Sequence, residues 1–409
     1  MRRSWIGLAL LLPLAIPVAG TGAPTRADRL ELAHPAGGHE VQVSAPAIAA
    51  GADGAPVVAW IAGGHTGNTL FVARPGDGDA PVRVNPAATS VDSAHQAPGL
   101  AVGRGGEVYV TWSASKPKPE GVLFASDLFL SRSLDGGRTF EPPLRLNEDR
   151  PISHSFEDLA VTADGTVLVG WIDSRDGARQ TATYVARVTD RGARLDGATR
   201  LEGGETCVCC RVSVSAGPAQ SATVMWRKVF PGDIRDMVVS RSADGGRTFD
   251  PATAVHADRW KINACPHRGG QVAADARGRL YAIWYTEGAG GRPDVLFATA
   301  PDGKRFGAPR RVHTATGSVP DHARLAIDAS GRGIVVWEDS TAVRRRILLR
   351  SVAEGGRSLG PVRTLSQAIK AWAPDVAVVP GGFLVAWHEE QFPATKTIVQ
   401  PVTGEESVR

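Results

Sequence analysis

Apolar and polar residues alternate in short runs along most of the chain, and one pattern of runs returns seven times. Each copy has an apolar run, a turn that contains glycine, and a second apolar run that ends in tryptophan, as in GLAVGRGGEVYVTW and DLAVTADGTVLVGW. Alternation with a period of two indicates β-strands, and the turns between the runs indicate hairpins. The seven tryptophans lie 50 to 59 residues apart and are Trp60, Trp112, Trp171, Trp226, Trp284, Trp337 and Trp387.

A repeat of about fifty residues that is built from hairpins is typical of a β-propeller, in which each repeat forms one four-stranded blade. A third strand such as DLFLSRS and a fourth such as PLRLN follow the tryptophan. We therefore expect residues 28–409 to form a single all-β propeller, with seven blades favoured and six as the alternative. The last repeat ends after its third strand, so an N-terminal strand, from residues 28–34 or 39–45, should close the ring.

The N-terminal residues 1–27 have the pattern of a secretory signal peptide. Arg2 and Arg3 precede an apolar run from Trp5 to Val18, and small residues follow. This pattern predicts cleavage between residues 20 and 27 and export to the periplasm or the medium, with no stable membrane span afterwards; an uncleaved anchor is the alternative. The formal net charge is +4, and the basic residues are scattered rather than clustered, so the sequence does not predict nucleic-acid binding.

Two turns between predicted third and fourth strands share one octad, SLDGGRTF at 133–140 and SADGGRTF at 242–249. An aspartate carboxylate can accept hydrogen bonds from turn amides, and glycine supplies positive φ angles. The octads match the Asp-box, or BNR, motif, so the chain resembles the sialidase-like Asp-box β-propellers. The resemblance implies that these boxes are structural turns on the face away from the ligand, and it assigns a structural role to Asp135, Gly137, Asp244 and Gly246.

Cysteine and histidine gather in loops that should lie on the opposite face, near the axis of the propeller. If Gly99, Asp158, Arg211 and Gln271 begin the inner strands of blades two to five, each has an imidazole or thiol four positions earlier. The candidate rim consists of His95, His154, Cys207 and His267, with Cys209, Cys210 and Cys265 in the same loops.

The four cysteines allow two interpretations. An even number in an exported protein favours disulfides, such as one from Cys265 to Cys207, Cys209 or Cys210. A second bridge within the Cys-Val-Cys-Cys segment would be strained, because residues so close in sequence rarely reach disulfide geometry. Alternatively, thiolates and imidazoles surround a soft or borderline ion, Cu(I) or Zn(II).

The segment from Cys207 to Gly270 carries a narrower resemblance. It is similar to bacterial exported sialidase-like proteins of undefined function that share a Thr-Cys-x-Cys-Cys segment, an Ile-Arg-Asp and a Trp-Lys-Ile-x-x-Cys-Pro segment. These stand here at 206–210, 234–236 and 260–266. The resemblance covers two blades and implies a shared site without naming its ligand.

The resemblance to sialidases implies a Tyr nucleophile activated by Glu, an Asp acid/base and three arginines that hold the substrate carboxylate. The early Phe/Tyr-Arg-Ile-Pro segment of that family is missing. The catalytic candidates are Tyr285, Glu287 and Asp173, and the anion-binding candidates are Arg175, Arg211, Arg227 and Arg235. The alternative is structural: Tyr285 caps the edge of a blade, and the arginines pair with neighbouring aspartates.

These patterns predict an exported sialidase-like propeller that binds a ligand at the Cys/His rim without the complete sialidase machinery. Two alternatives stay open, a glycoside hydrolase that acts on an anionic glycan and a copper- or zinc-binding periplasmic protein. The partner classes are therefore a glycan, a metal ion or a periplasmic protein.

Overall fold

A computed structural model describes residues 29–33, 42–64, 67–92, 97–177, 180–288, 290–391 and 394–403. The expected signal peptide, residues 1–27, lies outside the described residues. No helix among the residues described is long and apolar enough to cross a membrane. Within these ranges the regular structure is β-strand, apart from a single 3₁₀ turn, η1 (Glu354–Gly356).

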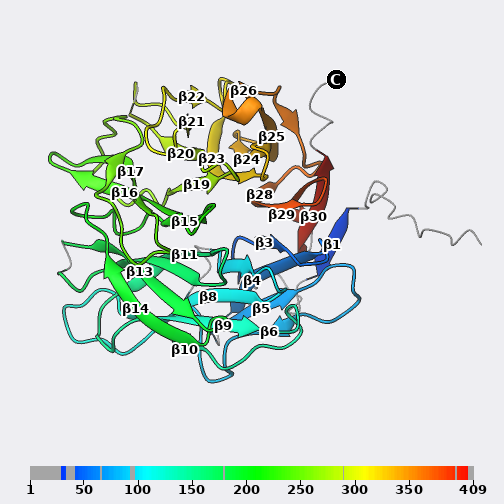
Figure 1. Cartoon of the computed structure of the whole chain (residues 1–409). Helices are drawn as coiled ribbons and strands as arrows, with labels where there is room; N and C mark the ends of the chain where they lie inside the picture. The colour runs from blue at the N-terminus through cyan, green and yellow to red at the C-terminus, as the bar shows by residue number, and fades with distance from the viewer. Residues whose placement is uncertain are drawn as a thin grey trace, which may run out of the picture.

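Seven antiparallel sheets are arranged in a ring around a central axis (Figure 1). The first blade contains β3 (Ala47–Ala50), β4 (Pro56–Gly64), β5 (Gly67–Ala73) and β6 (Val82–Arg83), and the second contains β7 (Gly99–Val102), β8 (Val108–Ser115), β9 (Ser126–Ser133) and β10 (Leu144–Arg145). The third contains β11 (His154–Val161), β12 (Val167–Asp173), β13 (Ala182–Thr189) and β14 (Arg194–Arg200). The fourth contains β15 (Ser213–Ala216), β16 (Ala222–Phe230), β17 (Ile234–Ser242) and β18 (Thr253–Ala254).

The remaining three blades complete the ring. The fifth blade contains β19 (Gly270–Ala274), β20 (Leu280–Thr286), β21 (Asp294–Ala300) and β22 (Arg310–Arg311). The sixth contains β23 (Val319–Ile327), β24 (Gly333–Ser340), β25 (Arg345–Ala353), β26 (Ser358–Leu359) and β27 (Arg363–Thr364). The seventh contains β28 (Ala371–Val379), β29 (Gly382–Gln391), β30 (Ala394–Thr403) and β1 (Leu30–Ala33). The expectation of a seven-bladed all-β propeller is therefore confirmed.

The ring closes where the two ends of the described chain meet. Strand β1 pairs antiparallel with β30, with Leu30 opposite Val399 and Ala33 opposite Lys396. Of the two segments expected to close the ring, residues 28–34 supply the closing strand, whereas β2 (Gln42–Val43) pairs with β4 in the first blade. Closure pairs the free edge of β30, which would otherwise be a template for aggregation.

Each blade packs on the next through one apolar cluster that contains one of the seven tryptophans. Trp226, for example, lies among Leu168, Ile172 and Val185 of the preceding blade, and Trp60 joins the last blade to the first. All seven indoles are at most 1 % exposed. Each tryptophan of the repeat therefore lies at one contact between blades, which explains why their number equals the number of blades.

The two octad turns have the same hydrogen-bond pattern. Asp244 Oδ1 accepts bonds from the backbone N–H groups of Arg247 and Thr248, and its Oδ2 accepts the Thr248 hydroxyl at 2.6 Å. The same bonds surround Asp135, and the second glycines, Gly137 and Gly246, have φ of 96° and 80°. Although burial opposes it, these hydrogen bonds lower the pKa of Asp135 to about 2. The turns join third to fourth strands, at the opposite end of the blades from the cysteine loops.

Candidate functional site

Both cysteine-bearing loops lie against the tip of the β16–β17 hairpin. The first loop runs beside β16, where the Cys207 N–H donates to the Arg227 carbonyl at 2.8 Å. The second runs beside β17, where the Arg235 N–H donates to the Trp260 carbonyl at 2.8 Å. The hairpin thus brings residues 205–210 and 259–265, about fifty positions apart in sequence, onto one end of the fourth blade.

Three of the four cysteines form a compact buried group, the thiol cluster, which we define as Cys207, Cys209 and Cys210. The Cys207 sulfur lies 3.1 Å from that of Cys210 and 3.9 Å from that of Cys209, and all three sulfurs lie within 4.8 Å of one another. Each residue is at most 4 % exposed. Phe156 and Val229 pack against the cluster, so its surroundings are largely apolar.

The only charged group that contacts the sulfurs among the described residues is Arg235. Its Nη1 donates to the Cys207 sulfur at 3.3 Å and to the Ala264 carbonyl at 2.7 Å. Hydrogen bonds with Cys209 and Cys210 lower the pKa of the Cys207 thiol, and the charge of Arg235 lowers it further. Burial raises the pKa of Cys210. The three thiols therefore form one hydrogen-bonded group beside the Arg235 guanidinium, in which the Cys207 thiol donates to the Cys210 sulfur.

A second guanidinium lies in the same hairpin and is completely buried. Arg227 donates to the carbonyls of Arg268, Arg235 and Tyr285, at 3.1, 2.9 and 2.7 Å, and its guanidinium lies 4.8 Å from the centre of the Trp260 ring. Carbonyl acceptors satisfy its donors but leave its positive charge unbalanced, which is costly in a buried position. This charge opposes the effect of burial on Cys210.

The other described members of the predicted rim are not part of the thiol cluster. Cys265 is exposed and is a free thiol like the other three. His267 is exposed, with its ring 6.0 Å from that of Phe156, which itself packs on the cluster. His95 lies outside the described residues. No disulfide is present among the residues that the structure describes.

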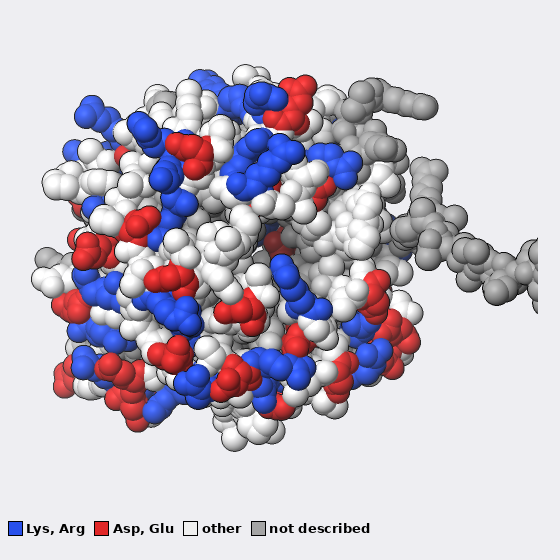
Figure 2. Space-filling model, in the orientation of Figure 1, with Lys and Arg blue, Asp and Glu red and all other residues white. Residues whose placement is uncertain are grey.

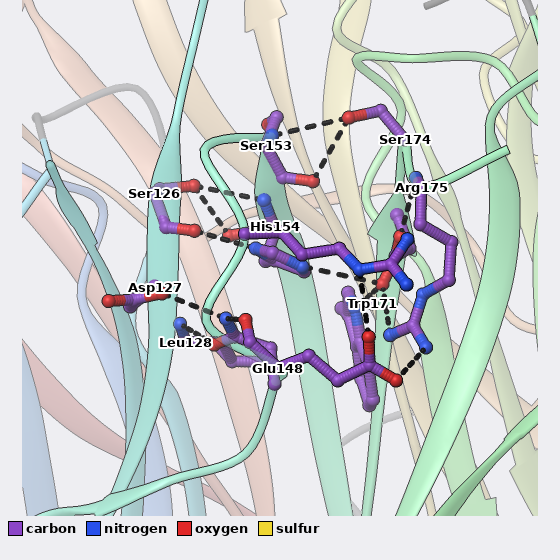
Figure 3. A network of polar contacts seen from close by, with 12 residues as sticks. Ser126, Asp127, Leu128, Glu148, Ser153, His154, Trp171, Ser174 and Arg175 are labelled. Atoms are coloured by element: carbon purple, nitrogen blue, oxygen red, sulfur yellow. Dashed lines mark hydrogen bonds and ion pairs between the residues drawn. The ribbon is translucent and has the colours of Figure 1, made fainter. Parts of the chain in front are cut away.

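His154 is part of a different polar network, which lies between the second and third blades (Figure 3). Its Nδ1 lies 2.6 Å from the Ser126 carbonyl and its Nε2 lies 3.6 Å from Asp173. Burial lowers the pKa of His154. The imidazole therefore joins the second and third blades and is not part of the thiol cluster.

Strand register explains why the expected ring of equivalent positions does not form. Of the residues expected to begin the inner strands, Gly99 begins β7, whereas β11 begins at His154, β15 at Ser213 and β19 at Gly270. Opposite the residue that precedes tryptophan stand Gly99, Asp158, Ser213 and Gln271. The expected equivalence, based on Arg211, is wrong by two residues. A bulge between Ser155 and Asp158 displaces His154 in addition.

Asp173 and Arg175 belong to the network of His154. Asp173 is 0 % exposed and accepts the indole N–H of Trp171 at 3.0 Å, the backbone N–H of Arg175 at 2.8 Å and its guanidinium at 2.7 Å. Arg175 also lies 4.1 Å over the Tyr184 ring. In this state both side chains are engaged by the protein itself.

Arg211 points into a cavity of about 180 Å³ on the propeller axis, which the inner strands of all seven blades line. Its guanidinium donates to the carbonyls of Glu157 and Ala97 and lies 3.9 Å from Asp158. Arg324 and Asp375, which sequence reasoning missed, form a second pair there at 3.5 Å. Figure 2 shows a hollow at the centre of one face and charges of both signs around it.

The polar residues on the axis follow a pattern that the sequence contains. Asp158, Ser213, Gln271, Arg324 and Asp375 all stand opposite the residue before tryptophan. Asp158 accepts the Val214 N–H, Gln271 accepts the Leu325 N–H, and Asp375 accepts the Ile48 N–H. Each bond joins one inner strand to the next, so alignment of the repeats on tryptophan would have found them.

Tyr285 and Glu287 are in contact, as their spacing suggested. The hydroxyl of Tyr285 donates to the Glu287 carboxylate, and the Arg268 guanidinium lies 4.8 Å over the ring while it pairs with Asp321. Burial and the bond to Glu287 raise the pKa of Tyr285. The tyrosine is 5 % exposed and packs against Trp260.

The four predicted anion-binding arginines do not converge. Each one donates to a different protein acceptor: carboxylates for Arg175, and carbonyls or a thiol for the others. A substrate carboxylate held by three arginines needs their guanidinium groups around one point. In the described residues, the arrangement with the clearest capacity for chemistry is the thiol cluster.

Comparison with known proteins supports the fold. No family model and no curated protein matches the chain. Among solved structures, it is similar to a protein of unknown function from Dyadobacter fermentans, with a TM-score of 0.54 and 12% identity over 92% of this chain and 99% of that one.

Two carbohydrate-active enzymes are similar in the same way. A polysaccharide lyase, an ulvan lyase, has a TM-score of 0.57 and 10% identity over 88% of this chain and 95% of its own. A Hadza microbial sialidase has a TM-score of 0.52 and 15% identity over 86% of this chain and 74% of its own. At such identities the likeness shows a sialidase-like propeller fold.

Proposed function

We propose that this protein is an exported propeller of the Asp-box type that binds a soft metal ion at the thiol cluster. The observation that carries the proposal is the approach of three buried sulfur atoms to within 4.8 Å of one another. Thiolate sulfur is the protein ligand that soft ions such as Cu(I) prefer, and Zn(II) accepts it as well. The two octad turns and the seven-bladed ring support the Asp-box type.

The positions of the sulfurs suit a common metal ion. With metal–sulfur bonds of about 2.3 Å, three sulfurs in a plane around an ion lie about 4.0 Å apart. The observed sulfur–sulfur separations begin at 3.1 Å and 3.9 Å, and none exceeds 4.8 Å, so the value of about 4.0 Å lies within their range. Small rotations of the side chains would therefore complete a site whose backbone is already in position.

The alternative expected from the sequence, disulfide bonding, makes a different prediction. One bridge within the cluster would leave its third thiol without a partner, and a bridge to Cys265 would draw that exposed residue inwards. Free-thiol counts on denatured protein, made with and without a chelator, separate the two states. Metal binding predicts four reactive thiols, whereas disulfide bonding predicts two or none.

Metal binding is tested with the full chain and single substitutions. Cys207→Ser and Cys210→Ser each remove one sulfur from the cluster, and we expect at least a hundredfold loss of Cu(I) affinity in a competition titration. Cys265→Ser is the matched control, because this thiol is exposed and lies outside the cluster. Equal affinity of the wild type and the Cys207→Ser variant would contradict the proposal.

A glycan-directed activity is the second candidate, and the Tyr285–Glu287 contact favours it. A tyrosine that donates to a glutamate is the arrangement in which a carboxylate activates a phenol as nucleophile. The similar solved structures include a sialidase and a polysaccharide lyase. Turnover of an aryl sialoside that Tyr285→Phe abolishes would support it, and no turnover across a panel of glycosides would remove it.

Export is part of the proposal, on the basis of the N-terminal pattern at 1–27. A periplasmic or secreted protein with three clustered thiols requires protection from oxidation, which a bound metal ion provides. Mass spectrometry of the mature N-terminus tests export: a first residue between 21 and 28 supports it, and an intact Met1 contradicts cleavage.

A further inference from the structure

We propose that Arg227 and Arg235 make the thiol cluster selective for a monovalent soft ion, Cu(I), over a divalent one such as Zn(II). The proposal rests on metal binding at the cluster and names the charge of the ion and the residues that set it. Two independent observations carry it, the number of sulfur ligands and the sign of the charges around them.

The ligand count favours a monovalent ion. Structural Zn(II) sites almost always have four protein ligands in a tetrahedron. Within the described residues, the group of metal-ligating atoms at this place contains three sulfurs and no histidine or carboxylate. Exposed Cys265 and His267 lie outside this group. Cu(I) is satisfied by two or three sulfurs, so the cluster is complete for Cu(I) and incomplete for Zn(II).

The surrounding charge favours the same ion. The guanidinium of Arg235 is 3.3 Å from the Cys207 sulfur, and that of Arg227 is fully buried in the same hairpin. Arg227 and Arg235 are joined directly, because Arg227 Nη1 donates to the Arg235 carbonyl at 2.9 Å. Two fixed positive charges therefore accompany the three thiols.

A metal ion binds after the thiols lose their protons. Three thiolates and a monovalent cation carry a net charge of −2, which the two guanidinium groups balance. A divalent cation leaves one positive charge in excess. Because repulsion by a fixed charge is proportional to the charge of the ion, the same two arginines oppose Zn(II) twice as strongly as Cu(I).

The nearest carboxylate in the hairpin, that of Asp236, bonds to backbone N–H groups rather than to Arg235 or the sulfurs. Asp236 alternates with Arg235 along β17, so its side chain is on the other side of the strand. It accepts the backbone N–H groups of Arg259 and Trp260 at 3.1 and 3.2 Å. Burial raises the pKa of Asp236, and its carboxyl also interacts with the charge of Arg227.

The test is a selectivity measurement on the reduced full-length protein. Affinities for Cu(I) and Zn(II) are measured anaerobically by competition with chromophoric chelators, and Ag(I) serves as a monovalent probe without redox chemistry. Three variants are compared with the wild type: Arg235→Gln removes the charge, Arg235→Lys keeps it, and Arg104→Gln removes a charge from an exposed turn of the second blade.

We expect the ratio of the Zn(II) to the Cu(I) dissociation constant to fall at least about tenfold in Arg235→Gln, from the loss of one nearby unit charge. In Arg235→Lys and Arg104→Gln it should stay within about threefold of the wild type. A wild type that binds metal but prefers Zn(II), or an Arg235→Gln variant with an unchanged ratio, overturns selectivity by charge while metal binding stands. A wild type that binds neither ion overturns the proposed function itself.

Discussion

The third and fourth blades differ at the position two residues after the tryptophan of each blade, which carries an aspartate in one and a lysine in the other. In the third blade, Asp173 stands two residues after Trp171 and accepts its indole N–H. In the fourth blade that position is Lys228, and the indole N–H of Trp226 has no partner among the described residues. In the third blade one carboxylate engages both the indole and Arg175, whereas the fourth blade has no carboxylate at this position and places thiols beside Arg235.

The comparison teaches how to separate a structural network from a binding site in this fold. The His154–Asp173–Arg175 network contains both charge signs, and its groups point at one another (Figure 3). The thiol cluster has two positive neighbours and no carboxylate contact in the described residues. We therefore expect substitutions in the third blade to reduce stability and those in the fourth to reduce binding.

The largest expected effect is on binding in the fourth blade. Cys210→Ser should reduce Cu(I) affinity more than a hundredfold while the melting temperature of the metal-free protein falls by only a few degrees. Isothermal titration under anaerobic conditions and calorimetry of the same samples check both values. If the variant lost several kilocalories of stability and kept its affinity, the cluster would be a core element like its neighbour.

The next effect is on stability in the third blade. Asp173→Ala leaves the buried Trp171 indole without its acceptor and removes one of the two carboxylate partners of the half-buried Arg175, so the free energy of unfolding should fall by about 2–3 kcal/mol. Urea denaturation measures this loss, and Cu(I) affinity should remain within about threefold of the wild type. A normal stability would show that water replaces the carboxylate and that the network is open.

A smaller effect is expected at the octad turns, which lie on the other face. Asp244→Asn keeps the size of the side chain but loses the charge that two backbone N–H groups and a hydroxyl share. The loss of stability should be about 1–2 kcal/mol, and metal affinity should not change. A change in affinity would mean that the two faces are coupled.

The smallest effect is the pH dependence that His154 contributes. Burial lowers its pKa in the folded state, so the unfolded chain binds the proton more readily. Stability should therefore fall as pH decreases below the unfolded value of about 6.5, by at most about 1.4 kcal/mol per pH unit. Denaturation of the wild type and of His154→Gln between pH 7.5 and 5.5 measures it, and equal slopes would contradict a neutral buried imidazole.

The fold could be predicted from the sequence because the signals are local and repeated. Alternating apolar runs and buried tryptophans specify strands and blade contacts, and the LELA run of β1 pairs with β30 as the closing strand. The outer strands could not be delimited, because β10, β18 and β22 have only two residues each. They depend on pairing to a neighbour rather than on their own pattern.

The candidate site was only partly predictable. Cys207, Cys209 and Cys210 are close in sequence, so one turn is enough to gather their sulfurs. The directions of His154 and His267 depend on a strand bulge and on positive φ, which no periodicity reveals. Cys265 is far from these residues in sequence and lies outside the cluster, next to Ala264, whose carbonyl bonds to Arg235.

The measurement that tests the central claim most directly is X-ray absorption spectroscopy of the copper-loaded, full-length protein. The account predicts one Cu(I) per chain with three sulfur ligands at about 2.3 Å, and a lower sulfur count in Cys207→Ser. A copper ion surrounded by nitrogen and oxygen alone, or a protein that binds no copper after full reduction, would contradict it.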